Sequence, residues 1–517
     1  MQPSAALTRQ RQIRGFVLAW LGITLVMGAL TFAGIYYATG LVAGEQEASV
    51  AALPNADADS LVDAAPLAAP PAEELAAPLE AAPPAAEQPA AAASAVEEAA
   101  PAADTAGQSA VAPAPEAGEP DEPAARVVAA PPATSGAQPA RQVATPIPTL
   151  TPRPIDVGGF QLGIQVQSNM DPEVYKLWMG EVRDKLKLGW IKEQVRWEVV
   201  EPQPGQYNWS ELDVTLPLAK EYGNKVMLSI VTAPEWAREP GAPRVDVDGK
   251  PLGGPPTDPQ TYANFITTLL YRYPGMVHAI EVWNEMNLDR EWASIYGLNA
   301  QNYVTLLRIA YSAIKAVDPG IIVISGALSP TGGDGGVRAY DDFVYMDMLI
   351  QAGVLETADC VGAHHNGYNI GPNVPWNQVP NDPRATFRGP FDNPHHSWSF
   401  YSTLNGYAQR IQQAGSNKKL CITEFGWPTT EDLNGYPRGF EFANDNTLAE
   451  QAQFLGEAIE GMESWGFVWL AWVWNLNYGP QAGWDATNDN VPYSLIRPDW
   501  QQAPAYEAIA EHNFRER

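Results

Sequence analysis

The chain has 517 residues, a formal net charge of −29 and a sequence pI near 4.5. This acidity argues against a nucleic-acid partner, because nucleic-acid binding needs a basic protein surface that displaces counterions. The chain has only two cysteines, so no disulfide framework is expected. Cys360 and Cys421 each precede the polar end of an apolar run, and we expect two buried, reduced thiols there.

The N-terminal segment carries the pattern of a membrane anchor. Residues 1–15 are basic, and residues 16–38 form an uncharged apolar run. Such a run exceeds the about 7–15 residues of a signal-peptide core and reaches the about 20 that cross a bilayer. The basic flank places the N-terminus in the cytoplasm. We therefore expect a single-pass protein of the cell membrane with its remaining chain on the extracellular side. The alternative is a signal peptide cleaved near residues 43–44, which would release a secreted protein.

The next segment, residues 45–154, is rich in Ala, Pro and Glu and almost free of aromatic residues. Such a composition cannot bury enough apolar surface to offset the chain entropy lost on folding. We expect a disordered linker, held extended by its proline residues and like charges, that separates the rest of the chain from the membrane.

From residue 155 to 517 the composition changes, and strand-like apolar runs alternate with amphipathic helical stretches. The predicted strands are residues 160–166, 191–197, 225–231, 277–283, 321–326, 360–364, 420–425 and 467–474. The predicted helices are residues 171–188, 210–222, 259–273, 299–317, 340–352, 399–414, 447–465 and 504–512. Eight strands that each precede a helix predict an α/β fold, the (β/α)8 TIM barrel. The rival, a doubly wound open sheet, normally has a glycine-rich phosphate turn after its first strand, and residues 160–169 contain none.

Polar side chains gather at the C-terminal ends of the predicted strands, where a barrel carries its active site. They are Arg196, Asn284, Glu285, His364, His365 and Glu424. A single buried polar residue is most often a satisfied core group. Two carboxylates at the ends of rigid strands are costly to bury without a purpose. A pair of this kind is typical of glycoside hydrolysis.

The motifs around these residues resemble those of the retaining glycoside hydrolases of clan A, most closely family 39 with its relatives in families 5 and 42. The resemblance rests on Val195-Arg196-Trp197, Val200-Glu201-Pro202, Ala233-Pro234-Glu235-Trp236, Trp283-Asn284-Glu285 and the run Ile422-Thr423-Glu424-Phe425-Gly426-Trp427. It extends from about residue 160 to 477. The sequence departs from it at Met286, where many relatives have proline.

The resemblance implies a role for each polar residue. Glu424 would be the nucleophile and Glu285 the general acid and base. Arg196 would form an ion pair with Glu424, and a less polar surrounding near Trp283 would raise the pKa of Glu285. Asn284 would bind the 2-hydroxyl of the cleaved sugar. One of His364, His365 and Tyr368 would orient Glu424, and the sequence leaves open which one.

Aromatic residues at or just past strand ends are candidates for stacking against sugar rings. Trp472 or Trp474 would form the floor of the cleaved-sugar site, and Trp236 and Trp427 are further candidates. The pairs His364-His365 and His395-His396 invite comparison with a zinc site, but no third ligand stands at a suitable spacing. We expect neither a metal nor another cofactor.

The sequence thus predicts a membrane-anchored, extracellular retaining glycoside hydrolase that acts on a β-linked polysaccharide or oligosaccharide. No obligate protein partner is implied. Two alternatives remain: a non-catalytic carbohydrate-binding barrel, and a transglycosylase that uses the same residues. The sequence does not determine the sugar, the linkage or whether the cut is internal or terminal.

Overall fold

The computed structural model describes residues 158–379 and 395–516. Their core is an eight-stranded parallel sheet. The strands are β1 (Gln161–Gln165), β2 (Trp190–Arg196), β3 (Lys225–Val231), β4 (Ala279–Val282), β5 (Ile322–Ser325), β6 (Val361–Asn366), β7 (Leu420–Gly426) and β8 (Val468–Val473). Each predicted strand is present, with small differences at its ends. Their nearly continuous burial is what parallel strands covered on both faces require.

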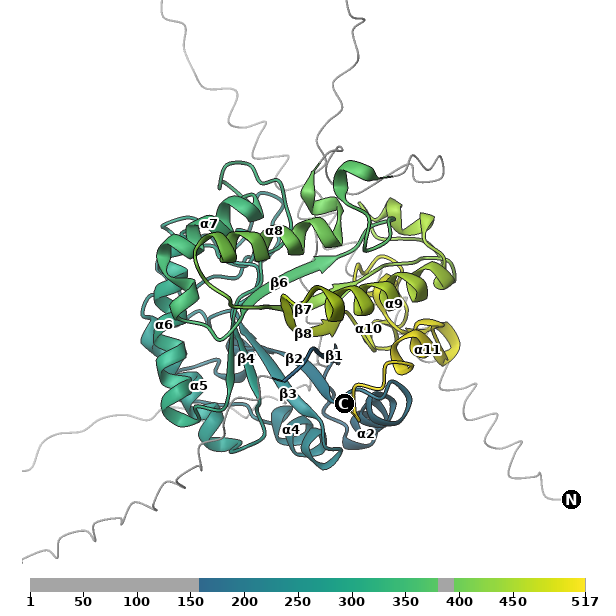
Figure 1. The fold of residues 1–517 in the computed structure, drawn as a ribbon. Coiled ribbons are helices and arrows are strands. Elements are labelled where there is room, and N and C mark those ends of the chain that lie inside the picture. Colours follow the sequence, from purple (N-terminus) through teal and green to yellow (C-terminus); the bar gives the residue numbers. More distant parts are fainter. Residues whose placement is uncertain (1–157, 380–394, 517) are drawn as a thin grey trace, which may run out of the picture. The chain divides into compact units, whose positions relative to one another are not determined.

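The sheet curves round until its two edges meet, so that the strands form a barrel (Figure 1). The hydrogen-bonded order is β5-β4-β3-β2-β1-β8-β7-β6. Two single bridges, Ile324 with Cys360 and Leu328 with Ala363, join β5 to β6 and complete the ring. The predicted (β/α)8 fold is confirmed for this part of the chain. All eight strands therefore present their C-terminal ends at one mouth.

Helices surround the barrel, as Figure 1 shows. The helices that match predicted ones are α2 (Pro172–Gly180), α4 (Leu212–Glu221), α5 (Pro259–Arg272), α6 (Ala300–Val317), α7 (Asp342–Ala352), α8 (Phe400–Gln413), α9 (Leu448–Trp465) and α11 (Ala505–Ala510). Their starts follow from side-chain capping. Asp171 and Asp258 accept hydrogen bonds from backbone amides two residues on, at 2.9 Å each. Thr447 and Glu450 form a reciprocal capping box at the start of α9.

The interior of the barrel below the mouth is filled by apolar side chains. Trp190 and Trp472 meet edge to face there, with ring centroids 5.7 Å apart. A Cβ atom on Gly163 would lie 2.5 Å from the Trp472 ring, so the neighbouring strand must carry glycine at this position. The lower barrel is therefore a packed core.

The predictions for the N-terminal part, namely the basic segment 1–15, the anchor 16–38 and the linker 45–154, lie outside the described residues. Among the helices that the structure describes, none is long and apolar enough to cross a membrane.

The expectation of two reduced thiols is wrong. Cys360 and Cys421 form a disulfide bond. Cys360 directly precedes β6 and Cys421 lies in β7, and the pairing of these strands brings their Cα atoms to 5.9 Å. This separation lies within the about 4.4–6.8 Å that a disulfide allows. The residues are 61 positions apart, so only the strand register reveals their proximity.

Candidate active site

Glu285 and Glu424 both lie near one ring nitrogen of His364, at the mouth of the barrel. Nδ1 of His364 lies 3.0 Å from Oε1 of Glu285 and 3.7 Å from Oε2 of Glu424. The two oxygens are therefore at most about 6.7 Å apart, compatible with the about 5–5.5 Å between the carboxyl groups of retaining glycosidases. The structure thus brings together the two carboxylates that the sequence analysis paired.

The position of Glu424 depends on an irregularity in β7. Ala363 and His364 are consecutive in β6, but they pair with Ile422 and Glu424, so Thr423 is an extra residue in β7. An extra residue of this kind, a β-bulge, changes the direction in which the neighbouring side chains point. Thr423 and Glu424 consequently both contact groups inside the barrel: the Thr423 hydroxyl donates to Glu281 at 2.7 Å, and Glu424 accepts from Lys192.

The counter-ion of Glu424 is Lys192, and the predicted pairing with Arg196 is wrong. Nζ of Lys192 donates to Oε1 of Glu424 at 2.7 Å and to the Thr423 carbonyl at 3.2 Å. Arg196, at the end of β2, instead pairs with Glu198. Lys192 lies four residues earlier in the same strand, and alternation of side chains puts it on the same face as Arg196. A buried lysine on the inward face of a barrel strand was the signal that sequence reasoning missed.

Glu281 is a third carboxylate near this pair, and it is fully buried. Its Oε1 accepts hydrogen bonds from Thr423 and from the backbone amide of Ala327. Its Oε2 lies 3.8 Å from Nζ of Lys192, and its Oε1 lies 3.9 Å from Nε2 of His364. Lys192 therefore lies between two carboxylates, and His364 has carboxylates near both ring nitrogens. The sequence analysis did not select Glu281.

Glu285 has two cationic neighbours. Arg290 forms an ion pair with one carboxylate oxygen, and His364 contacts the other. Burial alone would raise the pKa of Glu285, but Arg290 and His364 outweigh it and lower the pKa to about 2. The predicted increase in this pKa is therefore wrong for the unliganded protein. Burial by itself would lower the pKa of His364, yet the charges of Glu424 and Glu285 raise it.

Strand geometry places His364, and not His365, near Glu424, although the hydrogen bond of His364 is made with Glu285. His364 points into the barrel toward both carboxylates. His365, the next residue, points outward: its Nε2 lies 3.0 Å from the Ser397 carbonyl, and burial lowers its pKa to about 4. The predicted substrate-site role of His365 does not fit this outward position. Tyr368 lies beyond the end of β6 and lines the pocket described below.

The turn that carries Glu285 has an unusual backbone. Trp283 and Glu285 both have positive φ angles, 74° and 36°. Residues with side chains seldom adopt this conformation, which costs on the order of 1–3 kcal/mol and recurs at active sites. The indole of Trp283 donates to the Glu291 carbonyl at 3.0 Å and fixes the following loop. Asn284, between the two strained residues, is buried, and its Oδ1 has no hydrogen-bond partner in the described part of the chain.

The loop after Glu285 adds one more titratable group. Burial raises the pKa of Glu291 to about 7, although the charge of Arg290 opposes this effect. The charges of Glu285 and Glu424 raise it further, so this side chain lies within electrostatic reach of the catalytic pair. Arg290 and Glu291 belong to an irregular loop with no periodic pattern, and sequence analysis had no signal for either.

Of the four tryptophans predicted to contact sugar, Trp474 lies beside the counter-ion of Glu424. Its ring centroid is 5.8 Å from Nζ of Lys192, the cation that binds Glu424. Trp472 belongs to the packed barrel interior. Trp427 is fully buried beneath Gly367, and its indole donates to the Ile370 carbonyl. Trp236 packs on Trp197 and donates to the Glu201 carbonyl. Trp472 and Trp427 are thus packing residues, whereas Trp236 is partly exposed and its sugar contact stays a prediction.

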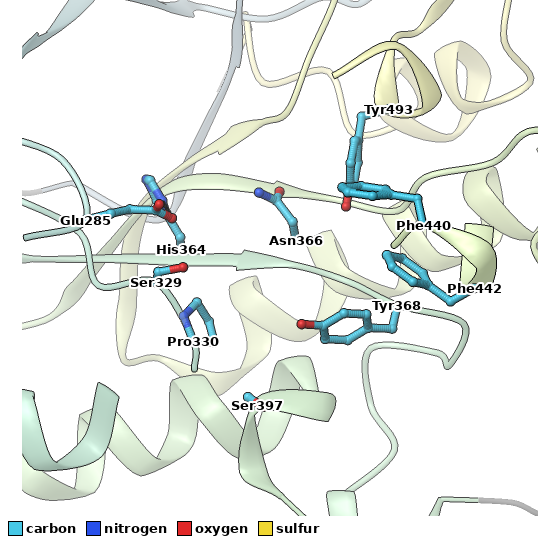
Figure 2. A pocket seen from close by; sticks show the side chains of 10 residues that line it. All are labelled: Glu285, Ser329, Pro330, His364, Asn366, Tyr368, Ser397, Phe440, Phe442 and Tyr493. Atoms are coloured by element: carbon cyan, nitrogen blue, oxygen red, sulfur yellow. Dashed lines mark hydrogen bonds and ion pairs between the residues drawn. The ribbon is translucent and has the colours of Figure 1, made fainter. Parts of the chain in front are cut away.

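A pocket opens beside Glu285, and Figure 2 shows its two ends. Glu285 and His364 form one end, and the aromatic rings of Tyr368, Phe440, Phe442 and Tyr493 form the other. Ser329, Pro330, Asn366 and Ser397 complete the lining. The described lining contains no Lys or Arg. The loop after β6 contributes Tyr368.

A group of possible metal ligands lies near the start of α7. Asp341, His395 and His396 offer atoms within 4.8 Å of one another. Each imidazole already has a protein partner, since Nδ1 of His395 lies 2.7 Å from Oγ of Ser397 and Nε2 of His396 lies 2.8 Å from Asp342. These contacts account for both histidines as structural residues that join the loop after β6 to α7.

The chain is similar to known glycoside hydrolases in sequence and in structure. A family model for glycoside hydrolase family 42, described as β-galactosidase, matches residues 182–254. A solved family 39 glycoside hydrolase from the gut symbiont Bacteroides cellulosilyticus WH2 is 19% identical, with a TM-score of 0.50, and the match covers 68% of this chain but only 63% of that one. A family 39 β-xylosidase from Caulobacter crescentus is 16% identical over 71% of this chain and 73% of its own, with a TM-score of 0.47. The predicted resemblance to the clan A glycoside hydrolases is confirmed.

Proposed function

We propose that this glycosidase cleaves β-glycosidic bonds of a polysaccharide or oligosaccharide by double displacement, with retention of configuration. The observation that carries the proposal is the placement of Glu285 and Glu424 around His364. The two oxygens that lie near His364 are at most about 6.7 Å apart, which admits the spacing of retaining enzymes and excludes most of the about 6.5–9.5 Å range of inverting ones. A non-catalytic barrel would have no need of two buried carboxylates with separate counter-ions.

In the first step Glu424 attacks the anomeric carbon, and the bond to the leaving oxygen breaks. Lys192 donates a hydrogen bond to Glu424 and fixes its direction. The leaving oxygen takes a proton from Glu285. In the second step Glu285 removes a proton from water, and the resulting hydroxide displaces Glu424 from the sugar. Trp474 would provide the apolar floor for the sugar, and Asn284 Oδ1 would accept a hydrogen bond from its 2-hydroxyl.

The proton for the first step is shared by Glu285 and His364. Arg290 lowers the pKa of Glu285 and the two carboxylates raise that of His364, in each case against the effect of burial, so a proton shared by the pair is favoured on His364, whose Nδ1 lies 3.0 Å from Glu285. Substrate binding must then move the proton to Glu285 as the glycosidic oxygen approaches. Two groups that interact this closely titrate as a pair.

We further propose that the catalytic domain, residues 155–517, works on the outer side of the cell membrane, tethered by the apolar segment 16–38 and the acidic linker 45–154. The composition of these segments supports the proposal. The disulfide between Cys360 and Cys421 adds support, because such bonds persist in oxidising compartments. Fractionation of cells into membrane, soluble and medium fractions would test it, and release into the medium would favour the cleaved-signal alternative.

Retention can be tested directly by the first product formed. We expect NMR spectra recorded within minutes of adding enzyme to an aryl β-glycoside to show the β-anomer of the free sugar, which then mutarotates. The panel should include β-xylosides, β-galactosides and β-glucosides, because the sugar is not determined by the residues described. An α-anomer formed first would contradict double displacement.

The shared proton predicts a pH effect for His364→Asn. The protein is active only while the His364–Glu285 pair holds a proton, so activity falls as pH rises through the pKa of the pair. In this variant only Glu285 can hold the proton. The pKa of Glu285 is lowered whereas that of His364 is raised, so the variant loses the proton at a lower pH than the wild type. We expect the alkaline limb of kcat/KM to move to lower pH by at least about one unit. At a pH above both limbs, kcat/KM of the variant should then be about tenfold below that of the wild type.

The control for this shift is Glu291→Gln, because Glu291 titrates near neutral pH in the same region. This variant should leave the alkaline limb in place if the His364–Glu285 pair sets it. A 2,4-dinitrophenyl leaving group, which needs little protonation, should make His364→Asn much less sensitive to pH. An unchanged limb in His364→Asn would show that Glu285 holds the proton without this residue.

A further inference from the structure

A groove between α9 and α11 lies on the flank of the barrel and takes no part in the candidate active site. From this groove we infer a docking surface for the chain's own linker: the linker segment 141–154 lies in the groove and ties the end of the linker to the barrel. The inference goes beyond the proposed function, because it concerns how the barrel is held and does not depend on the reaction.

The groove has a floor of small side chains. Ala452 and Gly456 of α9 and Ala508 of α11 contribute to it. Figure 1 shows the two helices side by side. A Cβ atom on Gly456 would lie only 3.8 Å from Cβ of Ala508, so the helices approach closely and leave space above this contact. The groove has a volume of about 370 Å³, which falls within the roughly 300–1,000 Å³ of typical binding sites.

Four carboxylates form the rims of the groove, two from each helix. Glu457 and Glu460 belong to α9, and Glu507 and Glu511 lie in α11 and directly after it. Like charges three or four residues apart repel one another and destabilise a helix. The lining contains no Lys or Arg, and none of the four carboxylates forms an ion pair within the described part of the chain. The charge of the groove therefore favours a cationic occupant.

The linker changes the sign of its charge just before the barrel. Residues 45–122 contain many acidic residues and no Lys or Arg. Residues 123–154 contain Arg126, Arg141 and Arg153 and no Asp or Glu. The cationic part of the linker is thus the part attached to the barrel, and its charge is complementary to that of the groove.

The proline spacing of the linker segment gives it a distinct edge. Four prolines between residues 146 and 154 favour the polyproline II helix, which has three residues per turn. On this repeat, one edge carries Arg141, Ala144, Ile147, Leu150 and Arg153. The carboxylates span about one turn of each helix, so the groove is roughly 10 Å long and takes two or three neighbouring positions of this edge. Ile147 and Leu150 suit its floor, and Arg153 suits its carboxylates.

The linker joins the barrel beside the groove. The ring centroids of Phe160, just before β1, and Phe514 are 5.5 Å apart, and those of Phe514 and His512, which lines the groove, are 5.9 Å apart. Arg153 precedes Gly158 by five residues, so even an extended chain keeps the two within roughly 18 Å. A segment tethered at such a range has an effective concentration on the order of millimolar, so a contact with a dissociation constant of about 1 mM is enough to dock it.

Docking fixes the place where the tether leaves the barrel. Gly158 directly precedes β1, at the end of the barrel opposite the mouth. With residues 141–154 in the groove, the tether leaves from the flank of the barrel instead. The docked segment thereby restricts the directions in which the mouth can face relative to the N-terminal part of the chain.

Two spin labels in the full-length protein test the docking. One label replaces Thr149, which neighbours the proposed contact edge but is not on it, and the other replaces Ser464, an exposed residue one turn beyond Glu460 in α9. The native cysteines are buried in their disulfide bond and do not take a label. We expect double electron–electron resonance to give a narrow distance distribution between the labels, whereas an undocked segment gives a broad one.

The decisive variant is Glu460→Lys/Glu507→Lys, which reverses one exposed charge on each rim. We expect the ratio of docked to undocked segment to fall roughly fivefold or more, the scale of two reversed surface ion pairs. Arg153→Glu added to this variant should restore most of the docked population. The matched control is Glu221→Lys/Glu356→Lys, which changes the net charge equally at exposed sites outside the groove and should leave the narrow distribution in place.

A wild-type distribution as broad as that of the reversed variant would overturn the inference, as would equal broadening in the control. A docked population that rises with protein concentration would also overturn it, because the occupant would then come from a second copy of the chain. In all these variants, kcat/KM for an aryl β-glycoside should stay within about twofold of the wild-type value, since the changes are on the surface and away from the catalytic pair. The proposed function is tested by that activity alone, so its failure is a separate result.

Discussion

Replacement of Glu424 by alanine is expected to abolish turnover of β-glycosides, with a loss on the order of 10⁵-fold in kcat. Azide should then restore turnover of a 2,4-dinitrophenyl β-glycoside. The side chain lost is the one held by Lys192 at 2.7 Å, and its removal leaves room for a small anion at the same face of the sugar. Attack from that face inverts the anomeric centre once, so the product is the α-glycosyl azide.

Glu285→Ala is the matched variant, because it removes the other carboxylate of the same pair. Here the glycosyl-enzyme still forms from an activated substrate, and azide attacks it in place of water. The expected product is the β-glycosyl azide, since two inversions restore the configuration. If Glu424→Ala gave the β-glycosyl azide instead, the roles of the two residues would be exchanged. If wild type and both variants bound a glycan equally and turned over nothing, the non-catalytic barrel would be the better description.

The fold was predictable because each local pattern agrees with the global structure. Strand β3 has the predicted bounds, 225–231, because it is a mostly apolar run, interrupted by Ser229, that lies between polar residues. Helices α5 and α9 begin where Asp258 and Thr447 offer caps. The two catalytic candidates were found for a similar reason: a carboxylate directly after a buried strand stands out in the sequence.

The rest of the site depends on register and on irregular backbone, which leave little trace in a sequence. The extra residue Thr423 decides where Glu424 points, and no residue type marks such a bulge. Between His364 and His365, strand phase decides which one faces the catalytic pair. Arg290 reaches Glu285 through a loop without periodicity. The disulfide was missed because it depends on the pairing of two strands that are far apart in the chain.

Lys192→Met is expected to reduce both activity and stability, because Lys192 is the shared counter-ion of two buried carboxylates. Its Nζ lies 2.7 Å from Glu424 and 3.8 Å from Glu281. Removing one partner of a buried ion pair typically costs about 3–5 kcal/mol, since the remaining charge is left uncompensated. We expect a loss of this size in the free energy of unfolding and a fall on the order of 10³-fold in kcat/KM.

The double variant Lys192→Met/Glu281→Gln separates these two effects. Glutamine keeps an acceptor for Thr423 and Ala327, which donate to Oε1 of Glu281, and it removes one of the uncompensated charges. Denaturant unfolding of both single variants and the double variant should therefore show a coupling energy of about 1–3 kcal/mol, with stability partly restored. Activity should stay low, because Glu424 still lacks the cation that fixes it. If activity returned together with stability, Lys192 would serve only the packing of the barrel, and the ionised nucleophile would have to be held by another group.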